Sequence, residues 1–210
     1  MTIFEEISGY IQAGRAAQVE TLVAQAISDG LPAGDILENG LLAGMNVIGE
    51  KFKNNEVFVP EVLIAARAMN KGIAVLKPHL SAAGVQEKGT AIIGTVKGDL
   101  HDIGKNLVKM MLEGKGIKVI DIGVDVSAEK FVSAAIENNA QLICCSALLT
   151  TTMNEMKNVV DAVAASELNG KVKVMVGGAP VSQSFAESIG ADCYTSDAAS
   201  AADMALELLA

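Results

Sequence analysis

The hydrophobic pattern of this chain changes its period near residue 80, and the change divides the sequence into two kinds of structure. Before that point apolar residues recur at helical spacing, and short polar breaks separate the runs. The four segments are 3–14, 16–29, 33–53 and 59–77. Four amphipathic helices with short connections predict an antiparallel helical bundle.

After residue 89, short runs rich in Val and Ile alternate with helical patterns. The expected strands are Thr90–Val96, Ile117–Ile122, Leu142–Cys145, Val172–Val176 and a short run at Asp192–Tyr194. The expected helices are 103–114, 128–138, 152–166, 181–188 and 198–209. This alternation predicts a parallel sheet covered on both faces, flavodoxin-like or Rossmann-like, with ligands outside the carboxyl ends of its strands.

The segment Pro78–Lys88 is typical of a linker, because it holds a proline and a run of small residues. We therefore expect a helical bundle over 1–80, a linker over 81–89 and an α/β domain over 90–210.

The charge of the chain argues against two kinds of partner, and its cysteine content argues against a disulfide-bonded fold. The net charge is −9 and no segment is rich in Lys or Arg, so neither nucleic acid nor a membrane surface is an expected partner. No apolar run approaches the roughly 20 residues that span a bilayer. Three cysteines, two of them adjacent, do not form a disulfide framework. A cytoplasmic protein fits best.

The polar stretch Gly98–Asn106 follows the first expected strand, where a ligand site would form. It contains His101, one of only two histidines. Asp99 can accept a hydrogen bond from Nδ1–H of His101, which leaves Nε2 able to bind a metal. Gly104 lets a bulky planar ligand approach the following helix. The alternative is an ordinary polar loop with a capping aspartate and a surface histidine.

A conventional metal site needs three or four protein ligands, and the sequence offers no such set near His101. His79 lies in the expected linker, and Cys144 and Cys145 lie on a strand expected to be buried. A single histidine suffices only where a macrocycle such as haem or corrin supplies the other ligands.

Two further clusters at strand ends favour a corrin. Ser146–Thr152 follows the third strand and Gly177–Ala179 follows the fourth. Small residues and hydroxyls there could admit a nucleotide tail, although each cluster alone could be a helix cap or a glycine turn. A dinucleotide site is disfavoured, since no G-x-G-x-x-G follows the first strand.

Taken together, these motifs give the chain a family likeness. It resembles the corrinoid proteins of cobalamin-dependent methyltransferase systems and the cobalamin module of methionine synthase, over nearly its whole length. The pattern appears as Asp99-x-His101-x-x-Gly104, Ser146-x-Leu148 and Gly177-Gly178.

The resemblance implies that cobalamin binds with its benzimidazole displaced and His101 as the lower ligand to cobalt. Asp99 and Thr152 would form a hydrogen-bonded relay with His101; the third position of that relay is often Ser. The other implied cofactor contacts are Gly98, Leu100, Asp102, Gly104, Ser146, Leu148, Thr150, Gly177, Gly178 and Ala198.

The bundle has its own matching motif, Gly44–Phe52. The resemblance implies that Phe52 and Val59 cap the upper face of the corrin. The family commonly has Leu at the position of Val59. Glu38 stands seven residues before Met45, on nearly the same face of a regular helix. It is either an edge residue that reaches solvent or, as the resemblance suggests, a polar contact to the corrin.

The function implied by the resemblance is that of a methyl carrier. Its cobalt would accept a methyl group through a substrate-specific methyltransferase and pass it to a second methyltransferase acting on tetrahydrofolate or a thiol coenzyme. The chain would be a subunit rather than an autonomous enzyme, and a reductive activase could be a further partner. Alternatives are a cobalamin sensor, a mutase subunit and a storage module. Methanol, methylamines, aryl methyl ethers and betaines remain open as donors.

Overall fold

The computed structural model describes Met1–Ala210, apart from the side chain of Ser81, and divides into two compact units. The first unit is Met1–Gln86 with Gly114–Gly116, and the second is Glu87–Glu113 with Ile117–Ala210. Among the described residues, no helix is both long and apolar enough to cross a membrane.

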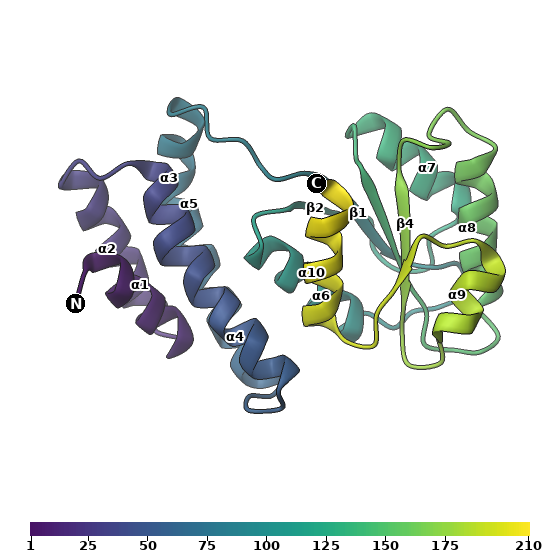
Figure 1. The fold of residues 1–210 in the computed structure, drawn as a ribbon, viewed down its shortest axis with the longest axis horizontal. Helices are drawn as coiled ribbons and strands as arrows, with labels where there is room; N and C mark the ends of the chain where they lie inside the picture. The colour runs from purple at the N-terminus through teal and green to yellow at the C-terminus, as the bar shows by residue number, and fades with distance from the viewer. The chain divides into compact units, whose positions relative to one another are not determined.

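The first unit is helical, as predicted (Figure 1). Its elements are α1 (Ile3–Gln12), α2 (Ala16–Ser28), α3 (Ala33–Asp35), η1 (Ile36–Leu42), α4 (Ala43–Lys53) and α5 (Val59–Ala82). A capping box starts α1, since the Thr2 side chain accepts from Glu5 N–H and the Glu5 side chain accepts from Thr2 N–H. The buried apolar residues of α1, α2, η1, α4 and α5 form the core of this unit.

The last helix of the bundle is longer than predicted. The sequence placed the start of a linker at Pro78, but α5 continues to Ala82, and Ala83 N–H donates to His79 O at 3.0 Å. Proline removes one backbone donor from a helix, and here the helix forms one further turn beyond it. The linker prediction was therefore wrong over Pro78–Ala82.

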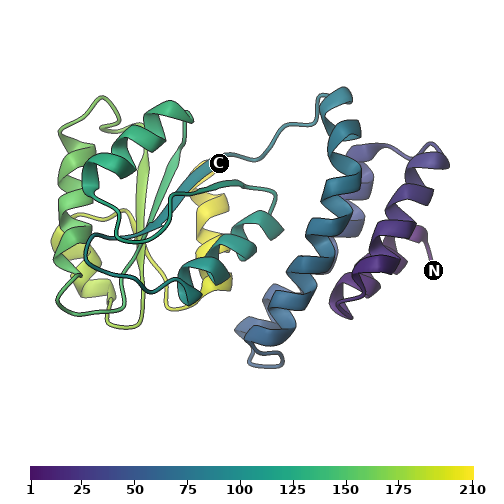
Figure 2. The ribbon, with the colours of Figure 1, turned by 180° about the vertical axis from the view of Figure 1, so that it is seen from behind.

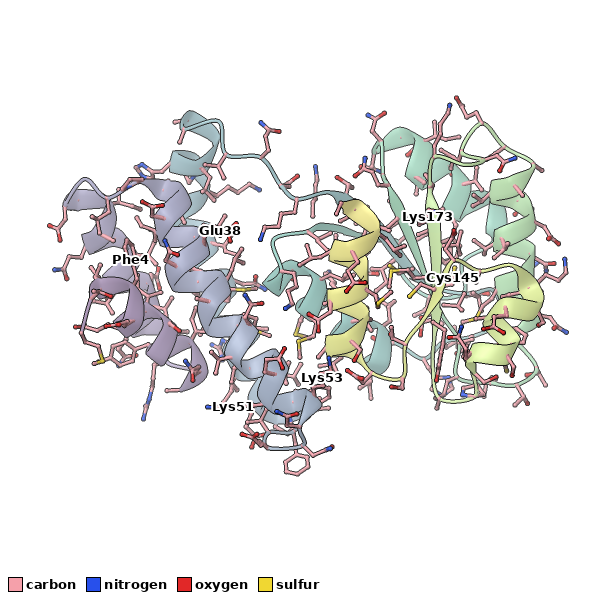
Figure 3. The ribbon with its side chains drawn as sticks, viewed as in Figure 1. Phe4, Glu38, Lys51, Lys53, Cys145 and Lys173 are labelled. Carbon is pink, nitrogen blue, oxygen red and sulfur yellow. The ribbon has the colours of Figure 1, made fainter. Side chains whose placement is uncertain are left out.

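The third predicted helix contains a π-helical stretch, η1, between α3 and α4. Its i→i+5 hydrogen bonds take more residues per turn than an α-helix. The seven-residue spacing therefore does not place Glu38 above Met45: Met45 is buried at 2% exposure, whereas Glu38 is exposed (Figure 3). The predicted common face of Glu38 and Met45 was wrong.

Close packing of α1 against α4 depends on Gly44. A Cβ at this position would lie 2.9 Å from Ile11 Cβ and 3.0 Å from Ser8 Cα. The absence of a side chain at Gly44 thus allows the two helices to approach closely.

The second unit is a five-stranded parallel sheet in the order β2-β1-β3-β4-β5, the flavodoxin-like order. Its strands are β1 (Thr90–Thr95), β2 (Lys118–Asp121), β3 (Leu142–Ser146), β4 (Lys173–Gly177) and β5 (Cys193–Tyr194). Helices α6 (Ile103–Gly114) and α10 (Ala198–Leu209) lie on one face, and α7 (Ala128–Glu137), α8 (Asn154–Ala164) and α9 (Gln183–Ile189) on the other (Figures 1 and 2). The predicted fold class is confirmed.

Apolar residues on both faces of the sheet explain why the strands read as continuous hydrophobic runs. Under α7 to α9, Ile92, Ile143 and Val174 of three neighbouring strands pack with Phe131 and Met156. Since the strands are parallel, all five carboxyl ends lie at one edge of the sheet. That edge carries every predicted site residue of this unit.

The three cysteines are free and buried in this sheet, where Figure 3 labels Cys145. Burial, with a smaller contribution from Cys193, raises the pKa of the Cys144 thiol to about 12. Burial also raises the pKa of Cys145 and of Cys193. Because the thiolate is the reactive form, all three thiols should be inert in the folded chain.

We therefore expect a thiol reagent in mildly alkaline buffer to leave the native protein unmodified. In denaturant the same reagent should label Cys144, Cys145 and Cys193, which can be counted by mass spectrometry. Labelling of the native chain as fast as of the unfolded chain would show that the sheet opens readily.

Candidate functional site

The candidate site is built from the loops that follow the strands of the second unit. The loop between β1 and α6 carries Gly98, Asp99, Leu100, His101 and Asp102, and Gly104 lies in the first turn of α6. The loop after β3 carries Leu148, Thr150 and Thr152, with Ser146 ending the strand. Gly177 ends β4 and Gly178 directly follows it, and Ala198 begins α10 after β5.

His101 is held by Asp99 and remains accessible. Its Nδ1 lies 2.9 Å from Asp99 Oδ1, and its backbone N–H donates to the same oxygen at 3.1 Å. The imidazole side chain is 51% exposed, whereas the Asp99 side chain is fully buried. An ionised carboxylate can only accept, so Nδ1 carries the proton and neutral His101 keeps its lone pair on Nε2. The hydrogen bond predicted from the Asp-x-His spacing is therefore present.

Asp99 is kept ionised by the hydrogen bonds that it accepts. Burial by itself raises the pKa of this carboxyl, but donors from Leu148 N–H, from His101 and from the Thr152 hydroxyl outweigh it and hold the pKa well below its usual value. The Leu148 N–H lies 2.8 Å and the Leu149 N–H 3.2 Å from Oδ2. The loop after β3 thus fixes the carboxylate that orients His101.

Thr152 completes this arrangement, with its hydroxyl 2.8 Å from Asp99 Oδ2 and 2.9 Å from Leu149 O. The residue is buried, so water could not easily take the place of its hydroxyl in these hydrogen bonds. Having one proton, the hydroxyl donates to one of these two acceptors at a time.

We expect Thr152→Val to lower the free energy of unfolding of the cofactor-free chain by about 1–2 kcal/mol, because a buried donor to a carboxylate is lost. Thr151→Val at the neighbouring, exposed position is the control and should change it by less than about 0.5 kcal/mol. Denaturant titration measures both. Equal stability of the two variants would mean that the Thr152 hydroxyl contributes nothing.

The two glycines at the end of β4 differ in their surroundings. Gly178 has φ +136°, and a Cβ there would lie 1.8 Å from Ala147 O, at the start of the loop that holds Asp99. A Cβ on Gly177 would meet nothing within 4 Å, and the same holds for Gly104. There is thus open space beside Gly177 and beside Gly104.

Exposed apolar side chains lie in the loops at this edge and at the start of α6. They are Leu100, Ile103, Val124, Leu148 and Leu149, with exposures of 72%, 76%, 37%, 42% and 42%. Large apolar side chains grouped at one exposed edge indicate a binding surface. Of these, Ile103, Val124 and Leu149 were not predicted, although each follows a strand at the expected ligand edge.

Two polar residues that shape the His101 loop were also missed. The hydroxyl of buried Thr95 donates to His101 O at 2.7 Å. Asp125 accepts from Gly98 N–H at 2.7 Å, and its own N–H donates to Asp99 O at 3.0 Å. The signal for Asp125 was its place after the second strand, where the sequence analysis assigned no site residue.

The remaining predicted site residues lie in the helical unit. Glu38 is in η1, Phe52 in α4 and Val59 at the start of α5. Phe52 and Val59 are half-buried and Glu38 is exposed. Their contact with a cofactor remains a prediction.

The donor set of the second unit fits a corrin. Among the described residues, no group of three or more His, Cys, Asp or Glu could hold a metal ion. One imidazole with Nε2 available, apolar side chains at the same edge and space beside Gly104 and Gly177 together match a macrocycle that brings its own equatorial ligands.

Comparison with protein families agrees with this fit. Two family models, each described as a B12 binding domain, match residues 89–206 and residues 3–77. The fold and the site thus define a cobalamin-binding protein, and cobalamin is its cofactor.

Known relatives show which kind of cobalamin-binding protein this chain resembles. The chain is 43% identical to dimethylamine corrinoid protein 2 of Methanosarcina mazei, over 99% of this chain and 97% of that protein. It is 40% identical to a corrinoid protein of Desulfitobacterium hafniense, over 100% of this chain and 98% of that one. The chain belongs to the family of corrinoid proteins, as its motifs predicted.

Solved structures show the same fold. The methanol:cobalamin methyltransferase complex MtaBC of Methanosarcina barkeri matches 99% of this chain and 79% of that chain, with 31% identity and a TM-score of 0.88. A cobalamin-binding protein of Desulfitobacterium hafniense matches 98% of both chains, with 26% identity and a TM-score of 0.80.

Proposed function

We propose that this chain is a methyl carrier that works between two partner methyltransferases. The observation that carries the proposal is the half-exposed imidazole of His101, held through Nδ1 by a buried, ionised Asp99. Bound cobalamin supplies a cobalt centre that can accept and release a methyl group. The protein's own residues bind and orient the cofactor.

When cobalamin is bound, His101 would hold its cobalt through Nε2, in place of the cofactor's own benzimidazole. Asp99 fixes the ring orientation and keeps the proton on Nδ1, as carboxylates commonly do for metal-binding histidines. Thr152 and the N–H groups of Leu148 and Leu149 hold Asp99 in turn.

The rest of the edge receives the ring and its tail. The exposed apolar residues Leu100, Ile103 and Leu148 would contact the apolar parts of the macrocycle. Gly98 and Asp102 in the first loop and Gly104 in the first turn of α6 would also contact it. Ser146, Thr150, Gly177, Gly178 and Ala198 would hold the nucleotide tail, and in the helical unit Glu38, Phe52 and Val59 are the residues that would contact the cofactor.

The first partner is a methyltransferase that takes its methyl group from a methylated amine. The whole-length similarity to dimethylamine corrinoid proteins supports this donor class over methanol, whose complex is matched at lower identity. A second methyltransferase acting on tetrahydrofolate or a thiol coenzyme would receive the group, and a reductive activase would supply electrons that return oxidised cobalt to its reduced form. Three free thiols support a reducing compartment, hence the cytoplasm.

Reconstitution with cobalamin and a panel of donor methyltransferases tests this function. The panel would include enzymes for mono-, di- and trimethylamine, methanol and aryl methyl ethers. We expect methylation of the bound cofactor with an amine enzyme, followed by transfer to one of the two acceptors. Transfer with the methanol enzyme alone would overturn the donor assignment. Binding of cobalamin without transfer from any donor would indicate a sensor or storage module.

A further inference from the structure

Lys105 occupies an unfavourable place for a cation. It lies in the first turn of α6 and is only 3% exposed. The N-terminus of a helix carries partial positive charge, which disfavours a nearby ammonium group. Burial adds a further cost that only good pairing offsets. A lysine at this position therefore needs an explanation.

The ammonium group of Lys105 is fully paired. Nζ donates to Asp121 Oδ1 at 2.7 Å, to Asp121 Oδ2 at 2.6 Å and to Asn106 Oδ1 at 2.9 Å, which matches its three hydrogens. Lys109 Nζ lies farther from Asp121, at 3.5 Å. Burial by itself raises the pKa of Asp121, but the two lysines and the hydrogen bond from Gly123 N–H outweigh it and lower the pKa.

From Lys105 one path of hydrogen bonds leads through Asn106 to Asp102, the residue after His101. Asn106 Nδ2 donates to Asp102 Oδ2 at 3.1 Å, and Asn106 N–H donates to Asp102 O at 2.8 Å. Asp102 directly follows His101 and begins the hydrogen-bonded ladder of α6.

From Asp121 a second path leads to the other side of His101. Gly123 N–H donates to Asp121 Oδ1 at 3.0 Å, and Gly123 O accepts from Thr95 N–H at 3.0 Å. The Thr95 hydroxyl donates to His101 O at 2.7 Å. The Lys105–Asp121 pair thus joins two hydrogen-bonded paths, one ending on Asp102 next to His101 and one on the carbonyl oxygen of His101, and both are separate from the Asp99 contact to the ring.

We propose that Lys105, through its ion pair with Asp121, is a positioning residue that sets the orientation in which His101 meets the cobalt. The inference rests on the proposed function, because it assigns a role toward the cofactor bound there. Stability alone is a weak reason for such a pair, since well-packed neutral residues can replace a buried ion pair without loss.

The test separates positioning from stability. Lys105→Met alone removes the closest cation from Asp121, and Asp121→Asn alone removes the carboxylate that neutralises buried Lys105, so each change should lower the melting temperature. The double variant Lys105→Met/Asp121→Asn removes both charges of this pair, and the amide oxygen introduced at position 121 can still accept from Gly123 N–H. Lys109 loses its longer 3.5 Å contact to the carboxylate, but its side chain is 32% exposed and keeps access to solvent. We expect the double variant to recover most of the melting temperature of the parent.

Histidine coordination is the second readout. Protein made with ¹⁵N-histidine and loaded with cobalamin in its Co(II) form reports coordination of His101 through the nitrogen splitting in electron paramagnetic resonance. We expect the double variant to lose the single ¹⁵N-coordinated species and to bind cobalamin roughly 10- to 100-fold more weakly.

Lys173 and Asp192, a more exposed ion pair with side chains 48% and 30% exposed, provide the control. This pair has Nζ and Oδ1 2.9 Å apart, and Asp192 also accepts a backbone N–H, but Lys173 begins β4 at the opposite edge of the sheet (Figure 3). Lys173→Met/Asp192→Asn should leave the ¹⁵N spectrum unchanged. A Lys105/Asp121 double variant with parental coordination and affinity would overturn the positioning role alone. Absence of the ¹⁵N signal in the parent would overturn the proposed function and this inference with it.

Discussion

His101→Ala should abolish coordination of the bound cobalt by the protein. With ¹⁵N-histidine labelling, the nitrogen splitting seen in electron paramagnetic resonance of the Co(II) form should change from that of the labelled imidazole to that of the cofactor's own base or of no nitrogen ligand. Affinity for cobalamin should fall by at least roughly tenfold. Loss of a residue that only supports a metal ligand already costs about that much, and here the ligand itself is removed.

The fold should survive this change. The imidazole is half-exposed, and Asp99 would still accept from the backbone N–H of residue 101, from Leu148 and Leu149 and from Thr152. We therefore expect the free energy of unfolding of the cofactor-free chain to change by no more than about 1 kcal/mol. Loss of coordination would then not reflect unfolding.

His79→Ala is the control, since His79 is the other histidine of the chain and lies exposed near the end of α5. It should keep the parental spectrum and affinity. Parental spectra in His101→Ala would instead sink the assignment of His101 as the ligand.

Local patterns in the sequence were enough to predict the fold and the contact between Asp99 and His101. The buried runs located every strand of the sheet to within two residues, because both faces of a parallel sheet are apolar. The contact between Asp99 and His101 was predictable because these residues stand two apart in one loop.

What the sequence did not show depends on tertiary pairing. Lys105 and Asp121 lie 16 residues apart, and each reads as an ordinary charged residue until β2 is placed beside β1. Thr95 and Asp125 meet the His101 loop for the same reason. The π-helical stretch η1 was missed because its apolar residues also fit a regular α-helix.

Gly178→Ala should be the most destabilising single change at the site, lowering the free energy of unfolding by about 3 kcal/mol or more. The backbone of Gly178 has φ +136°, which side chains rarely allow, and the added Cβ would lie 1.8 Å from Ala147 O. Backbone at Ala147 would have to move. Because Leu148 and Leu149 follow directly and donate to Asp99, the same movement should disturb the carboxylate that orients His101.

Gly177→Ala is the matched control and separates folding from binding. Apart from its own chain neighbours, its new methyl group would meet nothing within 4 Å, so denaturant titration of the cofactor-free chain should show a change below about 1 kcal/mol. If the nucleotide tail fills that space, the methyl group should weaken cobalamin binding by about 1–3 kcal/mol, the usual cost of overpacking. Full affinity in Gly177→Ala would place the tail elsewhere. If Gly178→Ala kept the stability of the parent, the loop after β3 would move away from residue 178 at little cost. The Asp99 carboxylate would then have to be held in place by contacts other than those to this loop.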